Sequence, residues 1–478
     1  MSYTNIRPWN IVAALAVSLY AATVVGQTVN IEPYSDEANA EALEQEAYSL
    51  GVLAYIYGRG PMLSYEWRYT ELWDESFAPA KGEMNEIFHF RQPWNPDFGG
   101  AAANNDVVYS EAWVDLARSA YVLQIPPTDG RYFSVQVFDF YTNTVGFKGR
   151  HTHGSDGFEL LLTGPGWGGS LPAGIDDMVQ SPTSIGYVVI RTFVNDEADL
   201  KNVYAYQDQY RIVPLKRWEE GNSTVGNARA ADYPVPPPFD LSDPLRYFVY
   251  LNHALTENAP PPEDAGLIAM LERIHVGPNQ DFRIADLEPP VEAGLRRAVA
   301  VATRIIDMAI QTGLTSKSST NGWEVTLDVG RHGLNYLRRA AIAKHFPHPL
   351  SSEGAFYPRV RVDSEGRRLH GKSRYQLTFE PNMIPETEAF WSLSVYDEQT
   401  RFVKNEIDRY TISDRTKGIQ FDDDGTLNIF IQHDRPKSGD SNWLPAPPGN
   451  FFIVLRAYQP SKRLQRGDYT PPPVDCLE

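Results

Sequence analysis

The sequence predicts a mainly β fold with a helical insert, in which two β-sandwich domains are separated by an α-helical segment. Two observations support this fold class. Short patterns in the first half of the chain recur in the same order in the second half, as in a duplicated module. Between the two halves, apolar residues follow the period of helices, whereas within the halves they alternate as in strands.

Two matched pairs of segments begin the repeat. Phe-Ser-Val-Gln-Val-Phe-Asp at residues 133–139 corresponds to Trp-Ser-Leu-Ser-Val-Tyr-Asp at residues 391–397. Further along, Trp167 precedes Leu-Pro-Ala-Gly, and Trp443 precedes Leu-Pro-Ala. A third match, between two apolar runs that each contain an arginine, follows in the same order. Together the three matches indicate two copies of one β-rich module. Convergence between unrelated sandwiches is the alternative, because each match is short.

Each half then continues into an apolar run that contains one arginine, Arg191 or Arg456. An unpaired buried charge is costly, so each arginine needs an anionic or carbonyl partner. We predict that Asp139 and Asp397, which close the first matched segment, supply that partner. The superposed halves should then align Asp139 with Asp397 and Arg191 with Arg456.

Residues 1–26 have the features of a secretory signal peptide. Arg7 precedes an apolar run at residues 11–25, and Gly26 supplies a small residue at the expected cleavage point. We therefore expect a secreted protein whose mature chain begins near Gln27, with an uncleaved anchor as the alternative. Asn222 begins an Asn-Ser-Thr sequon and is the predicted glycosylation site.

Residues 35–219 form the first predicted unit, an N-terminal helix followed by a β-sandwich. Ser35 is the predicted N-cap of the helix, and Gly58 with Gly60-Pro61 is predicted to end it. Beyond the helix, turn residues recur between alternating apolar runs, which is typical of strands.

A Pro-rich linker at residues 220–242 follows, then a helical segment at 243–345 and a second β-sandwich at 346–478. The linker contains Pro-Val-Pro-Pro-Pro, which neither a helix interior nor a central strand accepts. Within the helical segment, Pro289 marks the start of an amphipathic helix, and Gly313 marks its end.

The charge balance restricts the partners that we expect. The 478 residues contain 43 Lys and Arg against 61 Asp and Glu, so the net charge is −18. This charge disfavours nucleic acid and an anionic membrane surface as partners. The single cysteine, Cys476, excludes an intrachain disulfide, so stability depends on core burial.

The sequence contains no motif that predicts a cofactor or a metal site. The sequence has neither a phosphate loop nor a dinucleotide fingerprint, and it has no Gly-x-Ser-x-Gly nucleophile motif, so no cofactor is predicted. His151 and His153 have a spacing that can chelate a metal ion. A third ligand is not evident nearby, and no metal site is predicted.

Asn105, Asp106 and Tyr109 form the densest polar group and are the predicted catalytic residues. On a strand, Asn105 and Tyr109 share one face, and Asp106 takes the other. A carboxyl group near a phenol can transfer protons if burial raises the carboxyl pKa. The alternative is that Asn105 and Asp106 shape a turn through hydrogen bonds to the backbone.

Five further residues are predicted to bind a ligand. Aromatic side chains near turns or strand ends can hold a sugar or another flat organic molecule, although most aromatics in a sandwich fill its core. The predicted ligand-binding residues are Tyr141, Trp167, Arg191, Arg409 and Trp443.

Several longer motifs resemble a known pair of families. Asn-Asn-Asp-Val-Val-Tyr-Ser-Glu-Ala-Trp-Val-Asp-Leu at residues 104–116 and Gly-Pro-Gly-Trp at 164–167 resemble domain of unknown function 1254. Phe-Trp-Ser-Leu at 390–393 and Asn-Trp-Leu-Pro-Ala-Pro at 442–447 resemble its usual partner, domain of unknown function 1214. The resemblance covers most of residues 45–475. It implies an immunoglobulin-like sandwich, a helical section and a jelly-roll-like sandwich, but no established reaction.

We therefore predict a secreted, cofactor-independent acid–base enzyme of hydrolase type that acts on a small organic or glycan-like molecule. A role in forming a secreted metabolite is compatible with this prediction, as is a homo-oligomer. The alternative is a non-catalytic ligand-binding or assembly module. The enzyme hypothesis requires Asp106 to line a pocket, with Tyr109 or Arg191 within reach.

Overall fold

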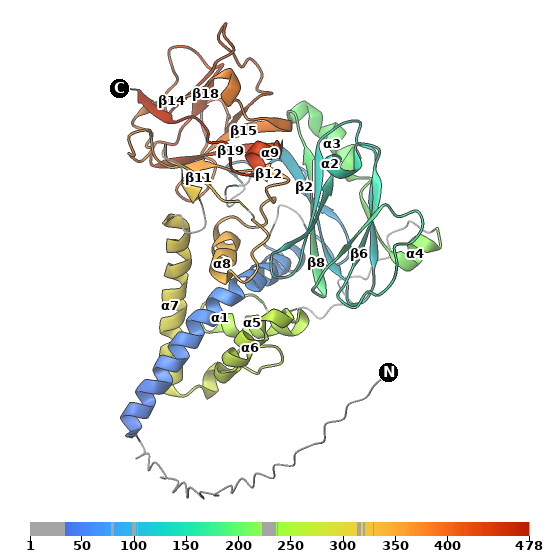
Figure 1. The fold of residues 1–478 in the computed structure, drawn as a ribbon, viewed down its shortest axis with the longest axis vertical. Coiled ribbons are helices and arrows are strands. Elements are labelled where there is room, and N and C mark those ends of the chain that lie inside the picture. The colour runs from blue at the N-terminus through green and yellow to red at the C-terminus, as the bar shows by residue number, and fades with distance from the viewer. Residues whose placement is uncertain are drawn as a thin grey trace, which may run out of the picture.

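The computed structural model describes residues 34–77, 81–97, 102, 104–221, 236, 238–312, 317–318, 321–327 and 329–477. Figure 1 shows three regions: a β region formed by the first half of the chain, a second β region formed by the C-terminal part, and a group of helices below them. The predicted signal peptide, Gln27, Asn222, Gly313 and most of the predicted linker lie outside the described residues.

The helical region combines the N-terminal helix with the helices between the two β regions. Helix α1 runs alongside α7 and also contacts α5 and α8 (Figure 1). The described α-helices are α1 (Asp36–Leu72), α2 (Arg150–His153), α3 (Leu200–Gln207), α4 (Leu215–Glu219), α5 (Arg246–Glu257), α6 (Ala265–Leu271), α7 (Pro289–Gln311), α8 (Tyr336–His345) and α9 (Lys462–Gln465).

Glycines allow α1 and α7 to approach closely. A Cβ added at Gly51 of α1 would lie 2.8 Å from the Cβ of Ala298, and one added at Gly294 of α7 would lie 2.3 Å from the carbonyl oxygen of Glu44. Helix α1 therefore packs as part of the helical region, although it precedes the first β region in the sequence.

Helix α1 begins as predicted but does not end where the sequence indicated. Ser35 is the N-cap, and its side chain accepts a hydrogen bond from the amide of Ala38. The helix then continues through Pro61 to Leu72, so the predicted end at Gly58 and Gly60-Pro61 is wrong. Proline leaves the carbonyl four residues earlier without its helical partner.

That carbonyl belongs to Tyr57, and it accepts a hydrogen bond from Nη2 of Arg339 in α8 at 3.0 Å. The two glycines serve close packing, since a Cβ at Gly58 would lie 2.6 Å from Leu251 and one at Gly60 would lie 2.8 Å from the Tyr141 carbonyl oxygen. Tertiary contacts from α8 and α5 thus keep the helix intact across its local breakers.

The first β region, here called the N-module, contains two sheets with strand orders β1-β2-β8-β4-β5 and β7-β6-β3-β9. Apolar side chains from both sheets share one buried cluster. Its strands are β1 (Phe88–His89), β2 (Val107–Asp115), β3 (Tyr121–Ile125), β4 (Phe133–Phe138), β5 (Thr144–Gly149), β6 (Phe158–Thr163), β7 (Asp177–Gln180), β8 (Ile185–Phe193) and β9 (Arg211–Pro214).

The second β region, here called the C-module, also contains two sheets. One has the order β10-β11-β13-β19-β15-β16, with β12 paired to β19, and the other has the order β18-β17-β14-β20. Its strands are β10 (Lys317–Ser318), β11 (Trp323–Val325), β12 (Ala355–Phe356), β13 (Arg359–Val360), β14 (Arg374–Phe379), β15 (Thr387–Asp397), β16 (Thr411–Ser413), β17 (Leu427–Gln432), β18 (Trp443–Pro445), β19 (Phe451–Pro460) and β20 (Val474–Leu477).

The two modules repeat each other in strand order. The order β2-β8-β4-β5 corresponds to β13-β19-β15-β16, and the order β7-β6-β3-β9 corresponds to β18-β17-β14-β20. In both modules one strand pair is parallel, namely β6 with β7 and β17 with β18, and the other pairs are antiparallel.

Register agrees as well as strand order. Arg191 faces Ser134 across β8 and β4, and Arg456 faces Ser392 across β19 and β15. The two serines are second in the first matched segment of each half, and the two arginines lie in the matched apolar runs. Arg191 and Arg456 are therefore equivalent, as predicted. The repeat that the sequence predicted is therefore confirmed in topology and register.

Asp139 and Asp397 also occupy equivalent turns. The Oδ1 atom of Asp139 accepts hydrogen bonds from the amides of Tyr141 and Asn143, and Oδ1 of Asp397 accepts one from the amide of Arg401. The residues that follow, Thr142 and Thr400, have positive φ angles of 67° and 62°. Both aspartates therefore stabilise a tight turn after the first matched strand.

Two details of the predicted repeat are wrong. The arginines do not pair with these aspartates, because Arg191 donates to Gln136 and Arg456 donates to Ser394 on the neighbouring strand of each module. Trp167 and Trp443 are also not equivalent, since Trp443 lies in β18 whereas Trp167 lies in the loop before β7. Short sequence matches outside strands do not fix spatial position.

Candidate functional site

A cavity of about 490 Å³ lies where α1, the N-module and the C-module meet. Its wall includes Trp67 and Glu71 from α1, residues of β2 and β8 from the N-module, and Arg456 from β19 of the C-module. The segment after α8 closes another side through His348. The cavity exists only because three regions that are distant in the sequence pack together.

Strands β2 and β8 supply the polar face of the cavity. Alternate residues of a strand point to one side, so residues 109, 111 and 113 share a face. Each lies opposite a residue of β8 that also has this orientation. The three cross-strand pairs are Tyr109–Arg191, Glu111–Val189 and Trp113–Tyr187.

Glu71 and Glu111 form a buried pair of carboxyl groups. They are 1% and 7% exposed, and they hydrogen-bond to each other, which requires one of them to carry a proton. Burial, followed by the charge of Glu111, raises the pKa of Glu71 well above its ordinary value. Burial also raises the pKa of Glu111, although hydrogen bonds from Tyr187 and Glu71 and the charge of Arg191 oppose it.

Indole and phenol groups hold the two carboxyl groups in place. Trp67 and Trp113 donate to the two oxygens of Glu71, the second at 2.7 Å. Tyr187 donates to Oε2 of Glu111 at 2.7 Å. The indole bonds lower the pKa of Glu71, but burial and the charge of Glu111 outweigh them, so we assign the shared proton to Glu71 and the negative charge to Glu111. A protonated acid and a base thus lie side by side at one cavity wall.

His348 supplies a neutral imidazole beside this pair. Its ring packs edge-on against Trp67 and Tyr187, and burial together with the charge of Arg191 lowers its pKa to about 3. Among the residues that the structure describes, none provides a hydrogen-bond partner for its buried Nε2. Its φ angle of 51° is uncommon for a residue with a side chain, so the surrounding packing holds this residue in place.

Of the three predicted catalytic residues, only Tyr109 lines the cavity. Its hydroxyl accepts a hydrogen bond from Nδ2 of Asn104 at 2.9 Å, and the guanidinium of Arg191 lies over its ring at 5.5 Å. Asn105 accepts a hydrogen bond from the Thr411 hydroxyl at 2.7 Å, at the contact between the modules.

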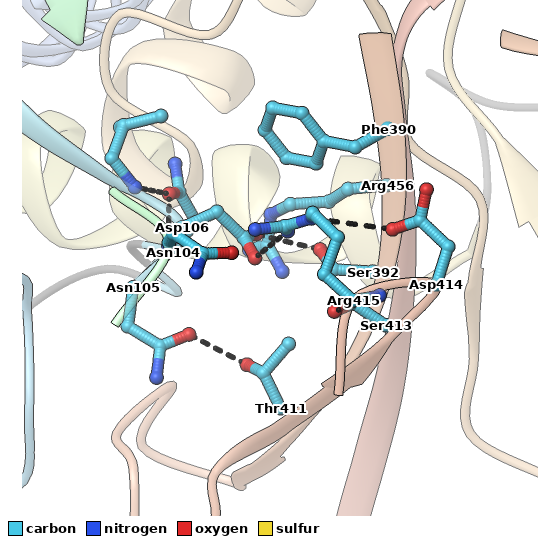
Figure 2. Close-up of polar contacts among 12 residues, drawn as sticks. Asn104, Asn105, Asp106, Phe390, Ser392, Thr411, Ser413, Asp414, Arg415 and Arg456 are labelled. Atoms are coloured by element: carbon cyan, nitrogen blue, oxygen red, sulfur yellow. Dashed lines mark hydrogen bonds and ion pairs between the residues drawn. The ribbon is translucent and has the colours of Figure 1, made fainter. Parts of the chain in front are cut away.

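Asp106 lies at the same contact, as Figure 2 shows. Its Oδ2 accepts from the Ser392 hydroxyl at 2.6 Å, and its Oδ1 accepts from Nη2 of Arg415 at 3.1 Å. Both carboxylate oxygens are thus bound to C-module residues outside the cavity wall. The requirement that Asp106 line the pocket is not met, and its position fits a structural role.

Among the predicted ligand-binding residues, Arg191 lines the cavity and the other four lie elsewhere. The Tyr141 hydroxyl donates to the carbonyl of Asn258 in the helical region. Arg409 donates to the carbonyl of Trp443, whose own indole donates to the Gln432 carbonyl at 2.9 Å. Trp167 is half-buried at the far sheet of the N-module.

His151 and His153 lie on the short helix α2, where each ring stacks on a phenylalanine. Within the part of the chain that the structure describes, no group of three or more His, Cys, Asp or Glu side chains is placed to hold a metal ion. Among those same residues, none of the helices combines the length and apolar character needed to cross a bilayer.

Sequence reasoning missed Glu71, Glu111 and His348. A signal for Glu111 was present, because it lies two residues after Tyr109 on the same strand and therefore shares its face. Glu71 and His348 gave no comparable signal. Each becomes part of the site only through the packing of α1 and of the segment after α8 against β2 and β8.

Comparison with protein families identifies two domains. Residues 84–214 match the family model for the protein of unknown function DUF1254, and residues 354–462 match that for DUF1214. The chain therefore carries these two domains in this order, and the sequence resemblance is confirmed. A comparison with curated proteins finds no match.

Two solved structures are similar to this chain. The VPA0106 protein from Vibrio parahaemolyticus has 21% sequence identity and a TM-score of 0.66, over 90% of this chain and 100% of that one. An uncharacterized protein from Burkholderia cenocepacia has 12% identity and a TM-score of 0.44, over 92% of this chain and 96% of that one. The first shares the fold of this chain.

Proposed function

Starting from a chain that pairs DUF1254 with DUF1214, we propose a cofactor-independent enzyme that performs acid–base chemistry on a small organic molecule inside the cavity. The observation that carries this proposal is the buried carboxyl pair Glu71–Glu111 at the cavity wall. Strongly perturbed carboxyl groups in a cleft are typical of catalytic acids and bases.

The two carboxyl groups are assigned different roles. Glu111 acts as the base, because its carboxylate is held by Tyr187 and lines the cavity. Glu71 acts as the acid, because burial and its neighbour keep it protonated. In a hydrolysis, Glu111 would take a proton from the attacking water and Glu71 would return one to the leaving group. Tyr109 is placed to hydrogen-bond the substrate.

We also propose that the protein is exported after removal of residues 1–26 and acts outside the cell. Within the fold, we propose an immunoglobulin-like sandwich for the N-module and a jelly-roll-like one for the C-module. Amino-terminal sequencing of protein from the culture medium should begin near Gln27. Intracellular protein that keeps Arg7 would contradict export.

Turnover by matched variants tests the enzyme proposal. Wild-type protein and Glu111→Gln are incubated with a library of small organic acids, esters and glycosides, and consumption is followed by mass spectrometry. Loss of the base should lower kcat by about 100-fold or more, because a positioned general base contributes about 10²–10⁴.

Glu159→Gln is the matched control. Glu159 also accepts an indole hydrogen bond, from Trp218 at 2.7 Å, but it lies on β6 in the other sheet of the N-module. This variant should keep full turnover. Equal rates for Glu111→Gln and the wild type would remove the pair from catalysis, and retained ligand binding without turnover would favour a binding module.

A further inference from the structure

The cavity contains two equivalent Tyr–Arg pairs, one from each module. In the N-module, Tyr109 faces Arg191 across β2 and β8. In the C-module, β12 and β13 pair with β19 in one continuous register, which places Tyr357 opposite Arg456. All four side chains line the same cavity. The repeat thus brings two copies of one cross-strand pair together.

Both arginines are deeply buried and bound to uncharged acceptors. Arg191 is 5% exposed and donates to Gln136 Oε1 at 2.8 Å and to the His348 carbonyl at 2.7 Å. Arg456 is 4% exposed and donates to Ser394 Oγ at 3.0 Å and to the Ala102 carbonyl at 2.6 Å. Among the described residues, neither guanidinium forms a salt bridge with a carboxylate.

The positive charges of both arginines affect the same two tyrosines. The charges of Arg191 and Arg456 both lower the pKa of Tyr109 and of Tyr357, against the larger rise that burial causes. Each phenol therefore lies in the field of both guanidiniums. Asp106 lies near Arg456, but Arg415 already neutralises it through an ion pair (Figure 2).

We propose that the ligand is an aromatic organic anion whose carboxylate binds between Arg191 and Arg456, with the hydroxyls of Tyr109 and Tyr357 as additional donors. Guanidinium groups match a carboxylate in shape and charge, and burial strengthens the interaction. This inference rests on the proposed function, because it places the reacting part of the ligand beside the carboxyl pair Glu71–Glu111.

The spacing within β2 supports that arrangement. Glu111 lies two residues from Tyr109, about 7 Å along the strand. A carboxylate held by the arginines would place an adjacent ring or short chain next to Glu111. Aromatic residues line the rest of the cavity and suit a flat apolar body, among them Trp67, Phe77, Phe90, Trp94 and Phe346.

Isothermal titration calorimetry on the full chain tests the proposal. The probes are benzoate, phenylacetate and 2-naphthoate, each compared with its uncharged carboxamide. At least one carboxylate should bind tenfold or more tightly than its carboxamide. Arg191→Met and Arg456→Met should each reduce that preference to less than threefold.

Gentler variants and a control accompany the arginine variants. Tyr109→Phe and Tyr357→Phe each remove one hydroxyl, and each should weaken carboxylate binding three- to tenfold without affecting the carboxamide. Arg368→Met removes an exposed arginine of the C-module, whose side chain is 49% exposed, and should change nothing. If no carboxylate is preferred over its carboxamide, or if the arginine variants fold and keep the preference, the proposal is overturned.

The Glu111→Gln variant separates this inference from the proposed function. If both hold, this variant binds the carboxylate but does not turn over substrate. Loss of turnover in Glu111→Gln without any charge preference in the wild type would overturn the anion site alone. Charge preference together with full turnover in Glu111→Gln would support the anion site and overturn the acid–base roles.

Discussion

The two modules share their Tyr–Arg pair but differ in the next cross-strand pair. In the N-module, Glu111 faces Val189. At the equivalent place in the C-module, Arg359 faces Val454, and Arg359 donates to Glu324 at 2.8 Å. One copy therefore presents a carboxyl group to the cavity, whereas the other presents an arginine that is already paired.

In the proposed function, this difference separates the residues that bind the ligand from those that react with it. The shared arginines and tyrosines lie on both sides of the cavity and suit recognition of one ligand group. Among the described residues, the carboxyl pair occurs on one side only, because Glu71 comes from α1, which packs against the N-module through the indole of Trp113. If the proposed roles hold, a duplicated fold has kept a common binding element while one copy acquired reactive groups.

The largest expected effect concerns this one-sided carboxyl pair. The rate kcat/KM should follow a bell-shaped pH profile, because the pair works with one proton. At low pH both carboxyl groups are protonated, so the base is lost. At high pH both are ionised, so the acid is lost. The apparent pKa values of both limbs of this profile should be higher than those of ordinary carboxyl groups, because burial raises the pKa of Glu71 and of Glu111.

Steady-state kinetics from pH 4 to 10 measure this profile. Glu71→Gln should remove the alkaline limb while the acid limb stays, since Gln cannot ionise. A profile that is flat across neutral pH in the wild type would contradict the shared-proton arrangement.

The two equivalent turns offer the next comparison. Burial is the main cause that raises the pKa of Asp139 to about 6. Because the folded pKa exceeds the unfolded one, its contribution to stability is full below about pH 4 and is lost as the pH rises through 6. Between these two pH values, the free energy of unfolding of Asp139→Asn should rise by up to about 3 kcal/mol relative to that of the wild type.

Urea denaturation at pH 4 and pH 7 measures this gain. Asp397→Asn in the equivalent turn, where the carboxyl group is half-buried, is the matched comparison. Equal pH dependence for both variants would show that the two turns do not differ in this respect.

The contact between the modules should depend on Arg415. Its guanidinium pairs with Asp106 of the N-module and lies over the rings of Phe193 and Phe390, one from each module. Arg415→Ala leaves the buried Asp106 without its cation, so the free energy of unfolding should fall by about 2–3 kcal/mol.

Thermal denaturation followed by circular dichroism measures this loss. Arg368→Ala, which removes an exposed ion pair with Glu398, should cost less than about 0.5 kcal/mol. If the two variants are equally stable, Asp106 does not need Arg415 as its partner.

The smallest expected effect concerns the two threonines with positive φ, Thr142 and Thr400. Glycine adopts this conformation without the steric cost that a Cβ brings, but it also loses more entropy on folding. Thr142→Gly and Thr400→Gly should each change the unfolding free energy by less than about 1 kcal/mol, in the same direction. Opposite signs in calorimetry would show that the turns are not energetically equivalent.

The repeat itself could be read from the sequence, because it depends on local patterns. Alternating apolar residues place Ser134 and Ser392 opposite the two arginines in the same register. The N-cap at Ser35 was equally readable, since a cap is a contact between near neighbours. Such features need only residues that are close along the chain or on paired strands.

The continuation of α1 through Pro61 could not be read from the sequence. The Tyr57 carbonyl that proline leaves free is bound by Arg339, a residue far along the chain. The role of Asp106 was hidden for the same reason, because its partners Ser392 and Arg415 belong to the other module.

The sequence alone thus determined the two β modules, their equivalent arginines, the helical segment between them and the pair of families. Only the tertiary structure decided which polar residues form a site. Glu71, Glu111 and His348 meet through the packing of a helix, a strand and a loop, and their altered pKa values arise from burial that no local pattern encodes.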